Sequence, residues 1–430
     1  MSALDQKVRQ GYKQSEIGII PDEWDVLLMD EVTDSLSSGA TPFRGNSSFY
    51  KGSNRWITSG ELKYGVINDT IEKISDEAIK KANLKVHPSG TFLMAITGLE
   101  AAGTRGSCGI VGKPATTNQS CMAIYPNKKL KSNYLFHWYV YNGDELAFKY
   151  CQGTKQLSYT AGLLKTIPVL VPRDTTEQTA IANALSDVDS LLAELEKLIG
   201  KKQAIKTATM QQLLTGKTRL PQFASYTKGE KQGQPKGTKP SELGEIPEDW
   251  DVDKIGSIVS ITTGNKNTQD KLIDGKYPFF VRSQKVERIN SYSFDGEAVL
   301  TAGDGVGTGK IFHYINGKFD YHQRVYLMHN FGERIDGYYF YIYFSNYFYD
   351  RIMSMTAKSS VDSVRREMIA EMPIYLPSKA EQKAIATILS DMDSEIQTLE
   401  QRLAKTRQIK QGMMQELLTG RTRLPFKKES

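Results

Sequence analysis

Cysteine is scarce in this chain of 430 residues. The three cysteines are Cys108, Cys121 and Cys151, and no two of them have the C-x-x-C spacing typical of zinc sites and redox pairs. This scarcity argues against a disulfide framework, so we expect reduced thiols. Long apolar runs are also absent, and the first residues, MSALDQKVRQGYKQ, lack the apolar core of a signal peptide. We therefore expect a cytoplasmic protein without membrane contact.

Recognisable catalytic motifs are missing as well. The five histidines show no H-E-x-x-H spacing. The Gly-rich segment 303–310 differs from a phosphate-binding loop, because Asp304 and Ile311 occupy positions that require Gly and Ser or Thr. The chain has no Pro-Pro pair, and hence no Asn/Asp-Pro-Pro-Tyr/Phe motif of the kind that adenine methyltransferases use. A loose pairing of the carboxylates of Asp22 and Glu61 lacks a full counterpart in the second half, so we expect no metal site. These absences predict a protein with no active site and no cofactor of its own.

The overall composition permits a nucleic-acid partner without requiring one. The net charge is +6, with 39% hydrophobic and 24% charged residues, as in a soluble globular protein. The length corresponds to roughly three domains.

One long helical pattern occurs twice. It spans residues 177–221 and 381–425 with a constant offset and 25 identities in 45 positions. Apolar residues recur four and three apart, as in the seam of a coiled coil. Gly216 and Gly420 follow Leu-Leu-Thr and resemble C-terminal caps. We expect the two helices to pair through the seam residues Leu185, Val188, Leu192, Leu195, Ile199, Leu389, Met392, Ile396, Leu399 and Leu403.

A second repeat precedes each variable region. IPDEW ends at Trp24, and IPEDW ends at Trp250. This pattern indicates a turn that fixes a buried aromatic residue before a strand. Between anchor and helix, short alternating stretches and an aromatic-rich segment (133–150 and 338–349) predict a mixed α/β domain with a helix packed on a sheet. Stacking of the second aromatic segment on nucleic acid is the alternative.

The order of anchor, variable domain and helix is thus repeated in tandem, which predicts an α+β fold. The predicted boundaries are 1–176 for the first domain with its anchor, 177–221 for the first helix, 222–240 for a mobile Gly- and Lys-rich linker, 241–380 for the second domain, 381–425 for the second helix and 426–430 for a tail.

Loops of both variable regions carry side chains that suit base recognition. Arg reads guanine, Asn and Gln read adenine, and Gly allows a close approach of the backbone to phosphate. Solvated loop residues are the alternative for any single position. The candidate DNA-binding residues are Thr97, Gly98, Thr104, Arg105, Asn118, Gln119 and Ser120 in the first region, and Arg282, Ser283, Thr308, Lys310, His322, Gln323 and Arg324 in the second.

This arrangement resembles the specificity (S) subunits of type I restriction-modification enzymes. The resemblance rests on the IPDEW and IPEDW anchors and the LLTGKTRLP and LLTGRTRLP helix ends, and it covers essentially the entire chain. It implies two target-recognition domains that read the halves of a split, asymmetric site in double-stranded DNA, with antiparallel paired helices holding them apart. It also implies docking of two methyltransferase (M) subunits and of restriction (R) subunits. S-adenosylmethionine, ATP and Mg would then belong to those partners.

Two functions from other classes remain open at this point. A coiled-coil adaptor that binds only proteins would show no salt-dependent affinity for DNA. An autonomous DNA-modifying enzyme would need a catalytic motif that the sequence does not display.

Overall fold

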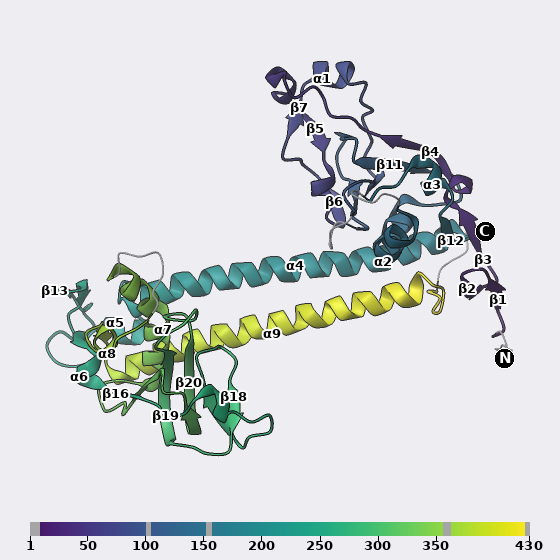
Figure 1. Ribbon diagram of the computed structural model, residues 1–430. Helices are drawn as coiled ribbons and strands as arrows, with labels where there is room; N and C mark the ends of the chain where they lie inside the picture. The colour runs from purple at the N-terminus through teal and green to yellow at the C-terminus, as the bar shows by residue number, and fades with distance from the viewer. Residues whose placement is uncertain (1–8, 100–104, 152–156, 356–362, 426–430) are drawn as a thin grey trace. The chain divides into compact units, whose positions relative to one another are not determined.

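The computed structural model describes residues 9–99, 105–151, 157–355 and 363–425 of the chain. It divides into a first unit, residues 1–196 and 401–430, and a second unit, residues 197–400. The boundaries fall inside the two longest helices, α4 (Thr175–Leu214) and α9 (Lys379–Leu417), drawn in teal and yellow in Figure 1. Each unit therefore holds one mixed α/β domain and one half of each helix, which confirms the predicted α+β class.

The first unit is built on a five-stranded sheet in the order β4, β11, β8, β9, β6. Neighbouring strands are antiparallel except for β6 and β9, which are parallel. Helix α2 (Ser132–Tyr150) packs against β8 and β9, and the rings of Phe92 and Tyr139 meet edge to face at 5.6 Å. The strands are β4 (Thr33–Ser38), β6 (Gly65–Ile67), β8 (Phe92–Ala95), β9 (Cys108–Val111) and β11 (Cys121–Pro126).

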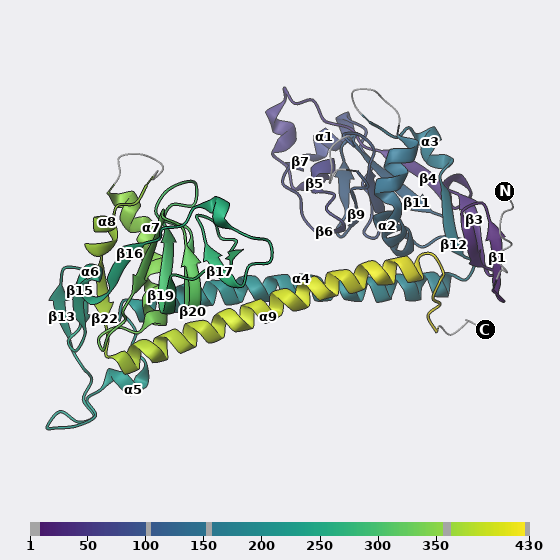
Figure 2. The same ribbon diagram turned by 60° about the horizontal axis from the view of Figure 1, so that its bottom comes forward.

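A smaller three-stranded sheet completes this domain. Its order is β10, β5, β7, and it has a separate hydrophobic cluster that contains Trp56. Figure 2 shows β5 and β7 next to helix α1. The elements are β5 (Asn54–Ile57), β7 (Lys73–Ile74), β10 (Ala115–Thr117) and α1 (Asp76–Lys81), with short helical turns η1 (Met29–Glu31), η2 (Ser47–Tyr50), η3 (Ser59–Glu61) and α3 (Ala161–Lys165).

The second unit contains a six-stranded sheet in the order β16, β21, β19, β20, β17, β18. Helix α7 (Gly337–Ser354) packs on β19 and β20, and the rings of Tyr339, Phe340, Phe344 and Phe348 are buried there. The aromatic segment thus fills the core, and stacking of these rings on nucleic acid is excluded. The elements are β16 (Ser260–Thr263), β17 (Tyr277–Phe280), β18 (Glu287–Ile289), β19 (Phe294–Ala302), β20 (Phe312–Tyr321), β21 (Val325–His329), α6 (Ile255–Ile258), η4 (Thr268–Asp270) and α8 (Arg366–Ala370).

Each anchor motif forms the same pair of small sheets. Pro21 and Pro247 end the second strand of a hairpin, a two-residue turn follows, and Trp24 and Trp250 are completely buried. The prediction of a turn before a buried tryptophan is therefore confirmed. The strands are β1 (Tyr12–Ser15) with β2 (Gly18–Pro21), β3 (Trp24–Leu28) with β12 (Pro168–Pro172), β13 (Thr238–Ser241) with β14 (Gly244–Pro247), and β15 (Asp251–Lys254) with β22 (Pro373–Leu376).

The end of each long helix packs on the anchor of the other half of the sequence. A Cβ atom at Gly420, after α9, would lie 2.5 Å from Pro21, and one at Gly216, after α4, would lie 2.6 Å from Pro247. Both glycines have positive φ angles of 72° and 70°, as the cap prediction requires. The second helix therefore completes the first unit, and the first helix completes the second unit.

A buried glutamate joins helix and anchor in the first unit. Arg423 donates to both carboxylate oxygens of Glu177, to Oε2 at 2.8 Å, and Nε1 of Trp24 donates to Oε2 at 3.2 Å. Arg423 also pairs with Glu23 of the anchor at 2.9 Å. Glu177 is only 1% exposed, so this charge depends on these donors. We call Trp24, Glu177 and Arg423 the first anchor cluster.

The second unit repeats this geometry with the partners exchanged between the helices. Arg219, at the end of the first repeat, donates twice to Glu381 at 2.7 Å and pairs with Asp249 at 2.8 Å. Nε1 of Trp250 donates to Glu381 at 3.0 Å. We call Trp250, Glu381 and Arg219 the second anchor cluster. The residues that are identical in the two repeats thus include the glutamate and the arginine that join helix and anchor in each unit.

The glutamine that follows each glutamate fixes the neighbouring domain helix. Gln178 accepts from the backbone N–H of Lys131, just before α2, at 2.8 Å. Gln382 accepts from the N–H of Asp336, just before α7, at the same distance. These bonds establish matching positions in α2 and α7 and explain why Glu-Gln begins both repeats.

Helices α4 and α9 pair in an antiparallel manner in both units, because partner numbers rise along one helix while they fall along the other. Two ion pairs lie in the first unit and two in the second. They are Asp189–Lys410 at 2.5 Å, Glu196–Arg407 at 2.6 Å, Lys202–Glu395 at 2.7 Å and Lys206–Asp393 at 2.5 Å.

The predicted seam residues are buried to different depths. Leu185 and Leu389 belong to the hydrophobic cores of their units as well as to the helices. A pair of helices leaves its seam open along the sides, which accounts for partial exposure at half of the positions. Leu185, Leu195, Ile199, Leu389 and Ile396 are buried, whereas Val188, Leu192, Met392, Leu399 and Leu403 are half-buried.

A histidine next to the first ion pair is buried without a counterpart in the second unit. Nε2 of His137 on α2 lies 2.9 Å from Oγ of Ser186, and Nδ1 lies 4.0 Å from Asp189, which pairs with Lys410. Burial, with Lys410 as a further cause, lowers the pKa of His137 from 6.5 to about 4. The unfolded chain therefore binds a proton at higher pH than the folded chain does. Stability is lost as the pH falls from 6.5 towards about 4.

Replacing His137 with isoleucine, the residue at the matching position 342, should remove this acid sensitivity. Between pH 7 and pH 4.5, the unaltered first unit should lose up to about 2.5 kcal/mol more of its unfolding free energy than the variant loses. Urea unfolding at the two pH values measures the difference. Equal losses in both proteins would contradict the assignment of this sensitivity to His137.

The predicted segment boundaries differ from the observed elements in two places. Both long helices begin two residues earlier than predicted, at Thr175 and Lys379, and they end before the capping glycines. The predicted mobile linker 222–240 contains most of α5 (Pro221–Ala224) and most of β13. Its Lys236 pairs with Asp249 at 2.7 Å, a tertiary contact that the linker-like composition of the segment did not predict.

Candidate nucleic-acid interface

Two groups of predicted residues meet at one edge of the sheet in the first unit. Thr97 and Gly98 follow strand β8, and Asn118, Gln119 and Ser120 form the turn between β10 and β11. The register pairs the last residue of β8 with the first residue of β11, and the N–H of residue 96 donates to the carbonyl of Ser120 at 2.9 Å. The structure therefore brings these five residues to a common edge.

A third loop, which the sequence reasoning missed, joins this edge. Oγ1 of Thr41 donates to Oε1 of Gln119 at 2.5 Å, and the N–H of Ala40 donates to the carbonyl of Thr117 at 3.2 Å. This approach requires glycine at position 39, where a Cβ atom would lie 1.8 Å from that carbonyl oxygen. The only signal in the sequence was a glycine followed by alanine and threonine after a strand.

Arg105 takes a different direction from the rest of this group. Its side chain lies against α2, where Nε is 3.6 Å from a carboxylate oxygen of Asp144, and that Nε has no hydrogen-bond partner. The hydroxyl of Tyr64 donates to its carbonyl at 3.0 Å. The structure does not join Arg105 to the 118–120 turn. Thr104 lies outside the described residues.

The second unit forms the corresponding edge. His322, Gln323 and Arg324 occupy the turn between β20 and β21, and the N–H of Gly303 after β19 donates to the carbonyl of Arg324 at 2.8 Å. Nε2 of Gln323 donates a hydrogen bond to Oδ1 of Asn267 at 2.6 Å. In the first unit, the matching Gln119 likewise bonds to an earlier loop, where it accepts from Thr41. The two edges thus have the same pattern of backbone hydrogen bonds.

Two arginines and an aspartate form a charged group on this second edge. Nη1 of Arg282 lies 2.8 Å from Oδ1 of Asp304, and Nε of Arg324 lies 3.7 Å from Oδ2 of the same carboxylate. The side chains of Arg282 and Arg324 are 43% and 66% exposed, so both guanidinium groups remain accessible. Asp304 was considered in the sequence only as a departure from a phosphate-binding loop.

The remaining predicted residues of the second edge support the backbone of the loops. The hydroxyl of Thr308 is buried and donates to the carbonyl of Gly305 at 2.6 Å. His322 is 4% exposed, and its Nδ1 accepts from the N–H of Arg324 at 2.9 Å. Ser283 donates to a carbonyl in its own turn, whereas Lys310 is exposed and lies 5.0 Å from the ring of Tyr349.

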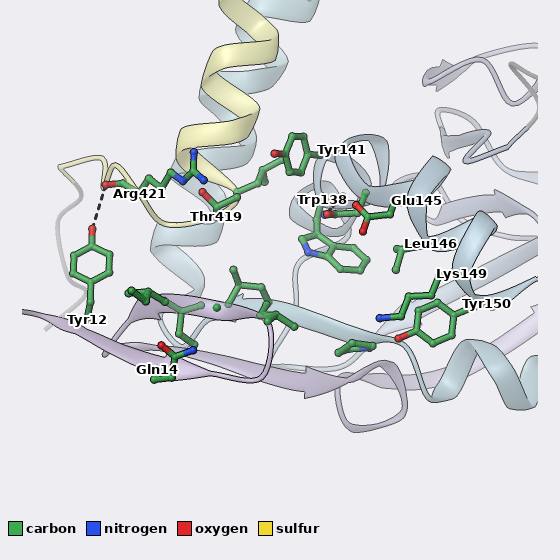
Figure 3. A pocket seen from close by; sticks show the side chains of 18 of the residues that line it. Tyr12, Gln14, Trp138, Tyr141, Glu145, Leu146, Lys149, Tyr150, Thr419 and Arg421 are labelled. Atoms are coloured by element: carbon green, nitrogen blue, oxygen red, sulfur yellow. Dashed lines mark hydrogen bonds between the residues drawn. The ribbon is translucent and has the colours of Figure 1, made fainter. Parts of the chain in front are cut away.

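A cavity of about 1000 Å³ in the first unit lies between the β1–β2 hairpin, α2 and the end of α9. Figure 3 shows Trp138 and Tyr141 on one side and Tyr12, bonded to the carbonyl of Arg421, on the other. The second unit carries tyrosines at 375 and 347, the positions that match Leu170 and Asn142 of the lining. The cavity shares no residue with the predicted DNA-binding set.

Carboxylates that suggested a metal site serve the backbone instead. Glu61 accepts from the N–H and the hydroxyl of Thr58 at 2.8 Å and from the N–H of Ile71 at 2.8 Å. Within the described ranges, no cluster of three or more His, Cys, Asp or Glu side chains is placed to hold a metal ion. None of the helices described here has the length and apolar character needed to cross a membrane.

A family model described as type I restriction modification DNA specificity domain matches residues 21–207 and 247–408. The two matches contain both anchors' tryptophans, both variable domains and most of both helices. They leave out the segment around α5 and β13.

Known specificity subunits resemble the chain over its whole length or over part of it. The putative type I restriction enzyme MjaX specificity subunit of Methanocaldococcus jannaschii is 25% identical over 96% of this chain and 97% of its own. The type I restriction enzyme EcoDI specificity subunit of Escherichia coli is 30% identical over 41% of this chain and 38% of its own. The crystal structure of a type I restriction-modification S subunit from M. genitalium superposes with a TM-score of 0.62 at 15% identity, over 97% of this chain and 98% of that one.

Proposed function

Because this chain belongs to the type I restriction-modification DNA specificity family, we propose that it is the subunit that selects the DNA sequence in such a complex. Its two domains are target-recognition domains, and each reads one half of a split, asymmetric site in double-stranded DNA. The paired helices α4 and α9 connect the two readers. The chain itself performs no chemistry.

The observation that carries this proposal is that the loop backbones at the two sheet edges are alike, whereas their side chains differ. Both sheet edges place loops through the same backbone contacts, with Gln119 and Gln323 at equivalent positions, yet most neighbouring side chains differ. A shared backbone arrangement with unlike polar groups suits two readers of different base sequences. The loops also carry Arg, Asn and Gln, which reach base edges in the major groove.

The repeated anchor clusters support the proposed partners. Because the two buried clusters contain identical residues in the same geometry, they hold the repeated segments around them in the same way, which suits two copies of one methyltransferase (M) subunit. Restriction (R) subunits would join that assembly. S-adenosylmethionine belongs to the M subunits in this proposal, and ATP and Mg belong to the other partners.

The experiment that tests this function combines a binding measurement with a modification map. The purified chain, alone and with its methyltransferase, should bind a DNA duplex with an affinity that falls steeply with salt. Cells that express both proteins should gain methylated adenines in one bipartite motif. Sequencing of the methylated genome reads that motif directly.

The two alternative functions give different results in the same experiment. A protein-binding adaptor would copurify with a partner but would leave DNA binding and the methylation map unchanged. An autonomous DNA enzyme would modify or cut DNA without the methyltransferase.

A further inference from the structure

Three matching positions at the two sheet edges that carry the candidate DNA-binding residues hold uncharged hydroxyl side chains in the first unit and charged side chains in the second unit. Backbone contacts establish the matching positions. The N–H of Asn118 donates to the carbonyl of Ile57, and the N–H of His322 donates to the carbonyl of Phe280, both at 2.9 Å. Two residues further along the chain are Ser59 in the first unit and Arg282 in the second unit.

The other two positions follow from the strand edges. The N–H groups of residues 96 and 303 donate to the carbonyls of Ser120 and Arg324, so these two residues match. One residue later, Thr97 forms a bridge with Ser158 as Asp304 does with Ser363. The hydroxyls of Ser59, Thr97 and Ser120 therefore stand where the second unit has Arg282, Asp304 and Arg324.

Arg282, Asp304 and Arg324 form a charged trio in which both guanidinium groups stay accessible to solvent. Asp304 is 27% exposed and contacts both guanidinium groups from between them, at 2.8 Å and 3.7 Å. One carboxylate leaves a net positive charge on the trio and leaves several N–H donors of each arginine unused. A guanidinium group held in this way can donate two parallel hydrogen bonds to one planar acceptor pair.

We propose that the second unit reads guanine with Arg282 and Arg324, which Asp304 positions, and that the first unit reads a half-site without arginine contacts. Guanine offers the O6 and N7 acceptors to which arginine binds in the major groove. In the first unit, Asn118 and Gln119 are the groups suited to adenine, and the three hydroxyls accept either base type. This inference rests on the proposed function and adds the base chemistry of each half.

The test exchanges each of the two arginines for the serine found at the matching position of the first unit. Arg324→Ser and Arg282→Ser should each relax one half of the methylated motif at a guanine, with a loss of about 10- to 100-fold in discrimination at that base. The other half should stay unchanged. Asp304→Asn should weaken the same guanine preference less, because both arginines remain. Lys318→Ser, which removes an exposed cation elsewhere in this unit, is the matched control.

A second readout separates base recognition from general attraction to phosphate. Duplexes in which the guanines of that half carry 7-deazaguanine lack the N7 acceptor. The complex should bind them about 10-fold more weakly than normal DNA, whereas a complex that carries both Arg282→Ser and Arg324→Ser should bind both duplexes equally. Equal weakening by Arg324→Ser on all sequences, with the motif unchanged, would overturn the proposal because it indicates a phosphate contact. A bipartite motif whose affected half contains no guanine would also overturn it, whereas absence of any bipartite motif would refute the proposed function instead.

Discussion

Replacing Arg423 with alanine is expected to lower the unfolding free energy of the first unit by about 3 kcal/mol. The change removes two hydrogen bonds to Glu177, which is 1% exposed and, among the described residues, keeps the bond from Trp24. A carboxylate left in the interior without its cation costs far more than an exposed ion pair contributes. The second unit should be unaffected, because its own cluster uses Arg219.

The matched control for this change is Arg421→Ala, two residues earlier in the same segment. Arg421 is exposed, and it takes part in the Tyr12 contact only through its backbone carbonyl. Denaturant unfolding followed by hydrogen exchange assigns each loss to a unit. Equal stability of the two variants would show that Glu177 does not depend on Arg423. Adding Glu177→Gln to Arg423→Ala should recover part of the loss, since it removes the unpaired charge.

Replacing Leu195 with lysine should disrupt the helix pair and with it the assembly of the complex. Leu195 is 3% exposed in α4, so the new ammonium group would lie between the helices with no carboxylate designed to receive it. The expected loss is several kcal/mol, roughly 3 to 5. The α/β domains should still fold, because their cores contain other residues of α4 such as Ile181. Size-exclusion chromatography with the methyltransferase subunit should show no stable complex.

Two further variants make this result specific. Glu194→Lys places the same group on the neighbouring exposed position and should leave the complex intact. Leu399→Lys in α9 should have a smaller effect than Leu195→Lys, because Leu399 is half-buried and a lysine there can extend its ammonium group to water. Normal assembly of the Leu195 variant would show that pairing at this point is not needed for docking.

The long helices and the anchors could be predicted because their signals are local. A seam repeat, a capping glycine and a tryptophan after Ile-Pro each act within a few residues. The aromatic segment at 338–349 was ambiguous between a core helix and a stacking surface, and the neighbouring strands β19 and β20 decided it. The segment 222–240 was predicted to be a mobile linker because of its composition. Composition does not reveal the contact between its Lys236 and Asp249.

The two sheet edges that carry the candidate DNA-binding residues could be predicted only in part. The turns 118–120 and 322–324 were selected by residue type, and the structure places both at equivalent sheet edges. Thr41, Asn267 and Asp304 were missed, because strand register brings them to these edges from loops far away in the sequence. Arg105 was selected by residue type, yet it lies against Asp144 of α2.

The sequence by itself determined that the chain is a tandem repeat with two long amphipathic helices and two unlike domains, because periodicity and identity act along the chain. Only the tertiary structure showed that the end of each repeat packs on the anchor that lies in the other half of the sequence. Arg423 binds the buried Glu177 although 246 positions separate them, and Arg219 binds Glu381 in the same way. An antiparallel helix pair brings the end of each helix to the start of the other, and a buried carboxylate can stay charged there only if a guanidinium group arrives with it.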